Sequence, residues 1–214
     1  MTTLSMHRPR PAVRAAAADD IRVAGVLAFL SGGTFLIGTM LAASIAPGYD
    51  FHGAAISDLG VIDETASLFN AVLIAVGLAN LGAGVLLYRA WRRPGVLAAF
   101  IAGGLGAVGA GAYALDDGGI HSLFALAAFV GFNLEALACA RCVSGPMRWI
   151  SLLAGVVGLA YVAVMLIGDT GTSAVFGPIG HGGSERMIAY PVMAWLLTFG
   201  GYLMATERAG QEAT

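Results

Sequence analysis

Hydrophobic residues run along this chain in six long blocks that short polar segments separate. The blocks cover about residues 21–46, 66–89, 95–115, 121–142, 148–168 and 186–206. Each block holds the roughly 20 apolar residues that a helix needs to cross the hydrocarbon core of a bilayer. The pattern therefore predicts an all-α fold, a polytopic membrane bundle of six transmembrane helices.

The segments between the blocks leave no room for a soluble domain. Only two of them, at about 47–65 and 169–185, are longer than a tight turn. The first block follows an arginine-bearing tail, but it is too long for the 7–15-residue core of a signal peptide, so we expect it to be retained. The predicted organisation is a disordered tail at 1–20, a six-helix domain at 21–207 and a second tail at 208–214.

Composition and charge support the membrane class and give an orientation. Charged residues make up 11% of the chain, hydrophobic residues 58%, and the mean hydropathy is +0.81; soluble domains carry about 25% charged residues. With six helices, ten of the eleven arginines fall on the side of the two termini, and eight acids fall on the other side. The positive-inside rule then predicts an inner-membrane protein with both termini in the cytoplasm.

Small residues indicate tight packing between the helices. The third block carries Gly103, Gly104, Gly106, Gly109 and Gly111, which lie three and four residues apart on helical faces. Such surfaces let helix backbones approach closely in lipid. This pattern leaves the oligomeric state open.

Polar residues that are candidates for binding or catalysis gather on the side opposite the termini. The first outer loop contains Ile56-Ser57-Asp58-Leu59-Gly60, and the second runs through His181 into Gly183-Ser184-Glu185-Arg186. The second, fourth and sixth helices begin on this side, so their positive N-terminal ends face the same layer. The candidate motif and binding residues are Ser57, Asp58, His121, His181, Glu185 and Arg186.

Three interpretations of this outer cluster stay open. In the first it is a brace: Ser57 or Asp58 caps a short helix, Ser184 caps the last helix, and Arg186, the one basic residue here, pairs with Asp58. In the second, zinc with an open position for water is held by His52, His121, His181 and Asp58, although no H-E-x-x-H spacing is present. In the third, Arg186 and the helix N-termini bind an anionic head group.

Polar residues also occur deep within the blocks. Asn80 and Glu135 lie about 14 residues from the outer ends of the second and fourth helices, roughly 21 Å deep at 1.5 Å per residue, and Asn133 is close by. Intramembrane acids often mark proton or ion paths. Because no second carboxylate completes a relay, we favour an interhelical hydrogen bond between Asn80 and Glu135.

The two outer motifs carry a resemblance to a known family. The I-S-D-L-G segment after the first helix and the G-x-E-R segment at the last resemble the bacterial and archaeal membrane family catalogued as domain of unknown function 998, over about residues 20–206. A similar I-S-D motif is found in damage-regulated autophagy modulator proteins, which implies a distant kinship. The resemblance implies six spans and motif residues at Ser57, Asp58, Glu185 and Arg186, but no agreed activity. The histidine candidates are not part of the family motifs and rest only on their positions in this sequence.

The leading functional hypothesis is a non-enzymatic membrane protein that binds a lipid or another amphiphile at the outer cluster. The first alternative is a metal-dependent membrane hydrolase of a lipid amide or ester, which loosely resembles the ceramidase-type superfamily with its Ser, Asp and three His; that family has seven spans and an H-x-x-x-H pair, and this chain has neither. The second alternative is a transporter of a small solute or ion. Nucleic-acid binding has no support, because the arginines form a rim at the membrane surface.

Overall fold

The computed structural model describes residues 11–212, and this part of the chain is helical without any strand. His7 and the other residues of 1–10 lie outside the described range, as do 213–214. The long helices are α1 (Pro11–Ile45), α2 (Ala66–Trp91), α3 (Pro94–Ala112), α4 (Gly119–Cys139), α5 (Pro146–Asp169) and α6 (Gly180–Glu212). Three short 3-10 helices, η1 (Ser57–Gly60), η2 (Leu115–Asp117) and η3 (Ser173–Ile179), lie between them.

Each predicted block corresponds to one long helix, so the six-helix membrane fold is confirmed. The largest differences from the predicted boundaries are at the start of α1 and at both ends of α6. Helix α1 begins at Pro11, where proline suits the first helical turn, and the alanine run after it continues the helix through part of the expected tail. Helix α6 begins at Gly180, six residues before the expected start at 186, because the polar Gly180–Glu185 segment is already helical.

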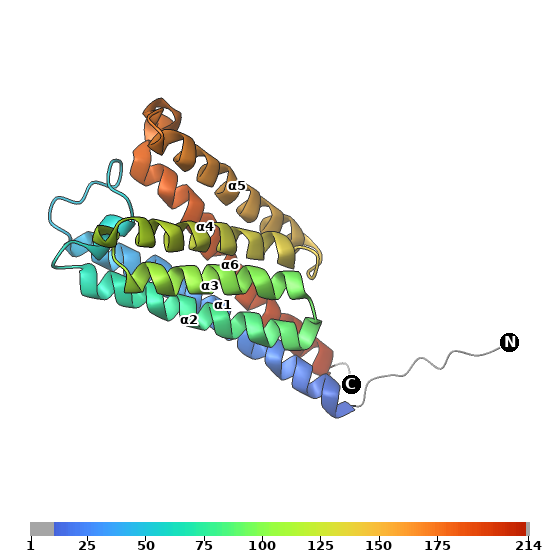
Figure 1. The fold of residues 1–214 in the computed structure, drawn as a ribbon. Coiled ribbons are helices and arrows are strands. Elements are labelled where there is room, and N and C mark those ends of the chain that lie inside the picture. The colour runs from blue at the N-terminus through green and yellow to red at the C-terminus, as the bar shows by residue number, and fades with distance from the viewer. Residues whose placement is uncertain (1–10, 213–214) are drawn as a thin grey trace.

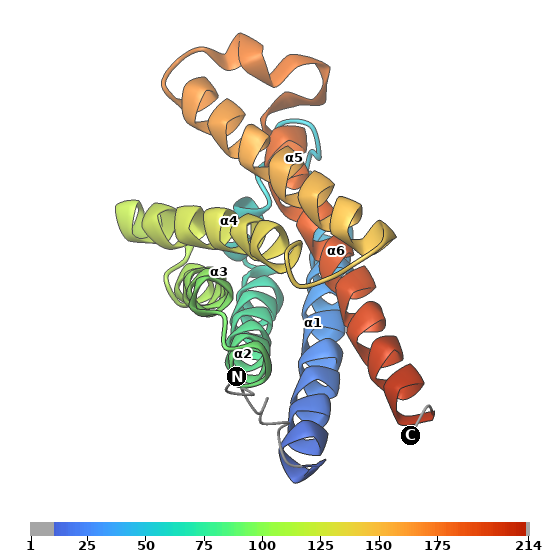
Figure 2. The ribbon, with the colours of Figure 1, turned by 90° about the vertical axis from the view of Figure 1, so that its right-hand side faces the viewer.

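The six helices form a closed ring in which each packs against its neighbours in the sequence and α6 returns to α1. The two described chain ends lie at the same end of the bundle (Figure 1). We call the opposite end, which holds the loop 46–65 and η1, η2 and η3, the outer end. Helices α4 and α5 stay close where the loop 140–145 joins them and diverge towards the outer end (Figures 1 and 2).

Close backbone contacts hold α2, α3 and α4 together. A Cβ atom on Gly77 would collide with the carbonyl of Gly104, and one on Gly131 would collide with the backbone of Gly103. These contacts confirm the packing role predicted for the small residues, because they allow the helix backbones to approach within van der Waals distance.

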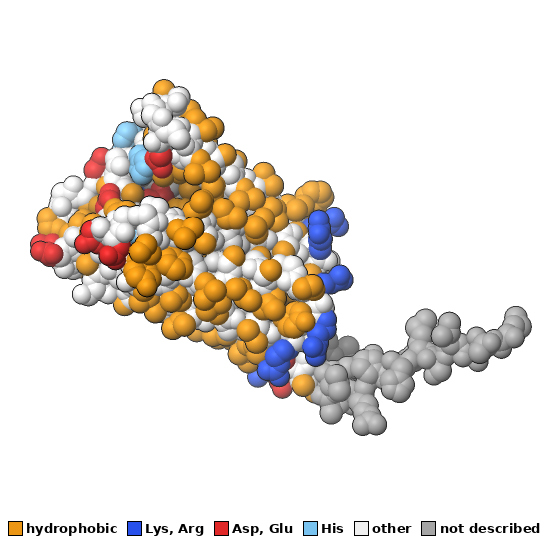
Figure 3. Space-filling model, in the orientation of Figure 1, with side chains coloured by type: hydrophobic (Ala, Val, Ile, Leu, Met, Phe, Trp, Pro, Cys, Tyr) orange, Lys and Arg blue, Asp and Glu red, His pale blue; other side chains and the backbone are white. Residues whose placement is uncertain are grey.

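The surface carries the charge separation expected of a membrane protein. Arginine side chains lie at the end that holds the termini, most acidic side chains and the histidines lie at the outer end, and apolar side chains cover the belt between them (Figure 3). Leu123, Trp149 and Leu153 are examples of large apolar side chains in the belt that are at least 67% exposed. An apolar belt of this kind suits contact with lipid, which makes this a multi-pass membrane protein.

Candidate functional site

Arg186 anchors the first outer loop to α6. Its Nη1 donates to the carbonyls of Phe51 and Ala54, both at 3.1 Å, and to that of Gly182 at 2.7 Å. Its Nη2 donates to the hydroxyl of Tyr49 at 2.5 Å. The guanidinium also lies over the rings of Phe51, at 4.7 Å from the centroid, and of Tyr49, at 5.5 Å. Loop and helix are thus joined by a buried cation within carbonyl oxygens and aromatic faces.

The predicted Asp58–Arg186 ion pair is wrong. Asp58 instead accepts a hydrogen bond from the backbone N–H of Ala55 at 2.8 Å, and the ion pairs of the described residues do not include it. The loop curls around Arg186, so its backbone carbonyls reach the guanidinium before any carboxylate does. The predicted connection between loop and sixth helix exists, but main-chain oxygens make it.

Glu185 binds the I-S-D segment as a hydrogen-bond acceptor, whereas Arg186 binds the loop as a donor. Its Oε2 accepts from the backbone N–H of Ile56 at 2.5 Å, although the two residues are far apart in the sequence. The side chain is 4% exposed, so this hydrogen bond lies in a poorly hydrated environment. Adjacent residues of α6 therefore bind the loop with complementary chemistry: Arg186 binds its carbonyls and Glu185 its N–H groups.

The predicted helix caps are not formed. Ser184 lies one turn inside α6, where its hydroxyl donates to the Gly180 carbonyl at 2.8 Å. The short helix η1 is present at Ser57–Gly60, but no side-chain hydrogen bond caps it. Both corrections follow from the earlier start of α6 and from the capture of Ile56 by Glu185.

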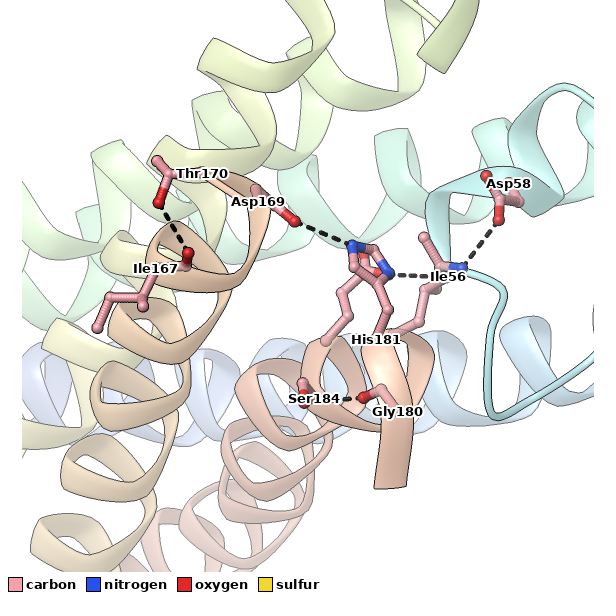
Figure 4. Close-up of polar contacts among 10 residues, drawn as sticks. Ile56, Asp58, Ile167, Asp169, Thr170, Gly180, His181 and Ser184 are labelled. Carbon is pink, nitrogen blue, oxygen red and sulfur yellow. Dashed lines mark hydrogen bonds and ion pairs between the residues drawn. The ribbon is translucent and has the colours of Figure 1, made fainter. Parts of the chain in front are cut away.

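The three outer histidines occupy different environments. His52 is exposed, and its backbone carbonyl accepts from the N–H of Gly182 at 2.9 Å. His121 is buried, and its Nδ1 lies 2.8 Å from the carbonyl of Tyr113. His181 lies with Nε2 3.3 Å from Oδ1 of Asp169, between the end of α5 and the Ile56–Asp58 segment (Figure 4).

The predicted zinc set of His52, His121, His181 and Asp58 is not assembled. Among the side chains that the structure describes, those of residues 15–205, no three or more of His, Cys, Asp or Glu lie close enough together to hold a metal ion. The exposed imidazole of His52 lies against Gly180 of α6, whereas His121 is buried on α4. A ligand set of the type that zinc requires is therefore absent from the described residues.

Most of the candidate residues meet instead at a cleft of about 460 Å³ between the diverging helices α4 and α5, with α6 at its base. Its polar lining contains Ser57, Asp58, His121, Ser122, Asp169, His181 and Glu185. Its apolar walls contain Leu126, Phe129, Val162, Met165, Leu166 and Ile188. A narrower apolar cavity of about 50 Å³ lies further inside and shares with the cleft Ser57, His121, Ala125, Phe129, Glu185 and Ile188.

Sequence reasoning missed the partners of these residues. Tyr49 was not a candidate, yet it receives a hydrogen bond from Arg186, and burial raises its pKa to about 12 even though the guanidinium opposes that shift. Asp169 was counted only among the outer acids, and it lies against His181. The sequence did contain a signal for this contact. Tyr49 and Phe51 are two aromatic residues in the first outer loop, and arginine stacks on aromatic rings, so they were candidate partners for Arg186.

The predicted intramembrane hydrogen bond is confirmed. Nδ2 of Asn80 donates to Oε1 of Glu135 at 2.7 Å and lies 3.2 Å from the carbonyl of Phe100, which links α2, α3 and α4. Asn133 extends the connection to α6 through the carbonyl of Ile188 at 3.1 Å. All three side chains are fully buried. They lie apart from the outer cleft, except that Asn133 reaches the inner cavity.

Comparison with known proteins identifies a family for this chain, and that family has no described function. Residues 29–202 match the model of a protein family described as a protein of unknown function, DUF998. No curated protein and no solved structure matches the chain. Because the family model covers most of the chain, including the I-S-D-L-G segment, Glu185 and Arg186, the protein belongs to the DUF998 family.

Proposed function

We propose that this protein binds an amphiphile, such as a membrane lipid, in the outer cleft between α4, α5 and α6. The observation that carries the proposal is the division of the cleft lining into a polar outer end and apolar walls. A head group would occupy the polar end near Ser57, Asp58 and His121. A hydrocarbon chain would lie along Phe129 and Met165.

The shape of the cleft supports this assignment. Its volume of about 460 Å³ falls within the range of about 300–1,000 Å³ that is common for small-molecule sites. Two wall residues, Leu126 on α4 and Leu166 on α5, are 38% and 53% exposed. The cleft is therefore open on the side where the two helices diverge, and an acyl chain could enter from the bilayer.

The alternatives have less support. A zinc hydrolase would need a ligand set that the described side chains, those of residues 15–205, do not assemble. A transporter would need a polar route across the bundle, and Asn80 and Glu135, which bond to each other, do not line the cleft. The amphiphile proposal uses the outer residues that the fold brings together.

We also infer that the protein lies in the inner membrane with both termini in the cytoplasm. Arginine side chains at the end that holds the termini and most acids at the outer end support this orientation. The cleft would then face the extracytoplasmic leaflet.

The proposal is tested by closing the cleft. Ala125 of α4 lines both the cleft and the inner cavity, and Ala125→Trp would fill them. Leu123 lies two residues away, is 67% exposed and does not line the cleft, so Leu123→Trp is the matched control. We expect native mass spectrometry of wild-type protein, purified in a mild non-ionic detergent, to show a retained lipid.

We expect Leu123→Trp to keep this lipid and Ala125→Trp to lose it while remaining folded by circular dichroism. Equal retention by both variants would contradict the proposal, as would a wild-type protein that retains no amphiphile.

A further inference from the structure

We propose that the head group bound in the cleft is a hydrogen-bond-donating cation, a primary or secondary ammonium, so that the ligand is an amine-bearing amphiphile. This inference rests on the proposed function and specifies the chemistry of its ligand.

The first support is the buried ring of His121. Its Nδ1 lies 2.8 Å from the carbonyl oxygen of Tyr113, and a carbonyl can only accept, so the proton is assigned to Nδ1. In the neutral ring Nε2 then presents a lone pair. This atom is buried and has no hydrogen-bond partner in the part of the chain that the structure describes. His121 is 3% exposed and lines both the cleft and the inner cavity, so a donor from a ligand or water there would satisfy its free acceptor.

The second support is the charge of the lining. Three carboxyl groups, those of Asp58, Asp169 and Glu185, line the cleft together with His181, which lies against Asp169, and the described lining residues include no arginine. Arg186 is directed to the carbonyls of Phe51, Ala54 and Gly182 and to the hydroxyl of Tyr49. Its guanidinium is therefore bound beside the cleft and does not line it, and the polar end of the cleft carries more carboxyl groups than basic side chains.

The two supports select the same chemistry. An ammonium brings a positive charge for the carboxylates and N–H donors for Nε2 of His121. An anionic head group would bring the charge that the carboxylates repel, and it would leave the His121 lone pair without a donor. A neutral alcohol would satisfy His121 but gain nothing from the acidic lining. The third sequence-based interpretation, an anionic head group on Arg186, is therefore disfavoured.

The test compares three probes of equal chain length: tetradecylamine, tetradecanol and tetradecanoate. Full-length protein is placed in phosphatidylcholine nanodiscs, and bound radiolabelled tetradecylamine is counted against empty nanodiscs to subtract partition into lipid. We expect unlabelled amine to displace the label, the alcohol to compete at least about tenfold more weakly, and the carboxylate not to compete.

The variants locate the site. Asp58→Asn and Asp169→Asn each remove one charge from the lining and should weaken amine binding by about three- to tenfold. Asp63→Asn removes an exposed acid of the same outer loop that does not line the cleft and should leave amine binding unchanged.

Each failure has its own meaning. If the alcohol competes as well as the amine, the ammonium assignment is overturned while amphiphile binding stands. If the carboxylate competes best, or if Asp63→Asn weakens binding as much as Asp169→Asn, the assignment is also overturned. If no amine is bound above empty nanodiscs, the ammonium inference fails, and lipid retention in Ala125→Trp and Leu123→Trp still decides the proposed function separately.

Discussion

Arg186 shows how a single buried cation can organise a loop without a carboxylate facing it. The residue is 8% exposed, and its four hydrogen bonds go to three carbonyls and one phenol. A planar guanidinium can serve several acceptors at once while its faces contact aromatic rings. The arrangement therefore depends on the shape of arginine as well as on its charge.

Replacing Arg186 by lysine tests this dependence. Lysine keeps the charge, but its compact ammonium cannot reach the Phe51 and Ala54 carbonyls and the Tyr49 hydroxyl together. We expect Arg186→Lys to lower the free energy of unfolding by about 2–4 kcal/mol, since buried acceptors lose their donors. Denaturant titration in detergent measures it. Arg148→Lys, at an exposed site, should change it by less than about 0.5 kcal/mol; equal effects would refute the shape argument.

The Tyr49 phenol gives a pH-dependent signal from the same contact. Burial raises its pKa from 10.0 to about 12 in the folded protein. The stability that the neutral phenol contributes is therefore complete below pH 10 and is lost as the pH rises towards 12. We expect the difference in tyrosinate absorbance between wild type and Tyr49→Phe to titrate near pH 12. A difference that titrates near pH 10 would show that Tyr49 is hydrated.

At the scale of the elements, the six helices were predictable and the outer loops were not. The length of an apolar run gives the length of the membrane-spanning helix directly. Asn80 and Glu135 lie at the same distance from the outer ends of their helices, and this was enough to predict their hydrogen bond. The loop 46–65 has no such periodicity. Its fold depends on main-chain carbonyls at Phe51 and Ala54, and a main-chain carbonyl carries no residue-specific signal. Charge counting therefore paired Arg186 with Asp58, which was wrong.

The contact between α3 and α4 predicts a strong position dependence for glycine substitutions. A Cβ on Gly131 would collide with the backbone of Gly103, which cannot move aside as a side chain can. We expect Gly131→Ala to destabilise the protein by about 1–3 kcal/mol. Gly95 is also helical but has nothing within 4 Å of its Cβ position, so Gly95→Ala should be neutral or stabilising by up to about 1 kcal/mol. Thermal unfolding of both variants checks this, and similar losses would contradict it.

The bond between Asn80 and Glu135 is expected to act as a neutral connection between helices. Glu135→Gln retains an oxygen that can accept from Asn80, and we expect it to change the unfolding free energy by less than about 1 kcal/mol. Glu135→Ala leaves Nδ2 of Asn80 with the Phe100 carbonyl alone and should cost about 1–2 kcal/mol. If Glu135→Gln destabilises as much as Glu135→Ala, the carboxyl group has a role that an amide cannot supply, such as proton binding.

At the scale of the whole molecule, the separation of charge and the position of the cleft are connected. Arginines lie at the end that holds the termini, and the acidic cleft opens at the other end (Figure 3). A negative cleft with a buried acceptor at His121 could serve as a receptor for cationic amphiphiles only if it faces the compartment that supplies them. The proposed function therefore depends on the orientation of the bundle in the membrane. This orientation can be measured without knowing the ligand.

Reporter fusions decide this orientation. Alkaline phosphatase folds only outside the bacterial cytoplasm and green fluorescent protein, exported unfolded, fluoresces only inside it. We expect phosphatase activity from a fusion after Gly118, between η2 and α4, and fluorescence from a fusion after Thr214. A fusion after Arg93, between α2 and α3, should be fluorescent and lack phosphatase activity, because the arginines there are retained on the cytoplasmic side. The opposite pattern at all three sites would place the cleft in the cytoplasmic leaflet. It would also show that another signal overrides the ten arginines, and the amine-bearing ligand would then have to come from the cytoplasm.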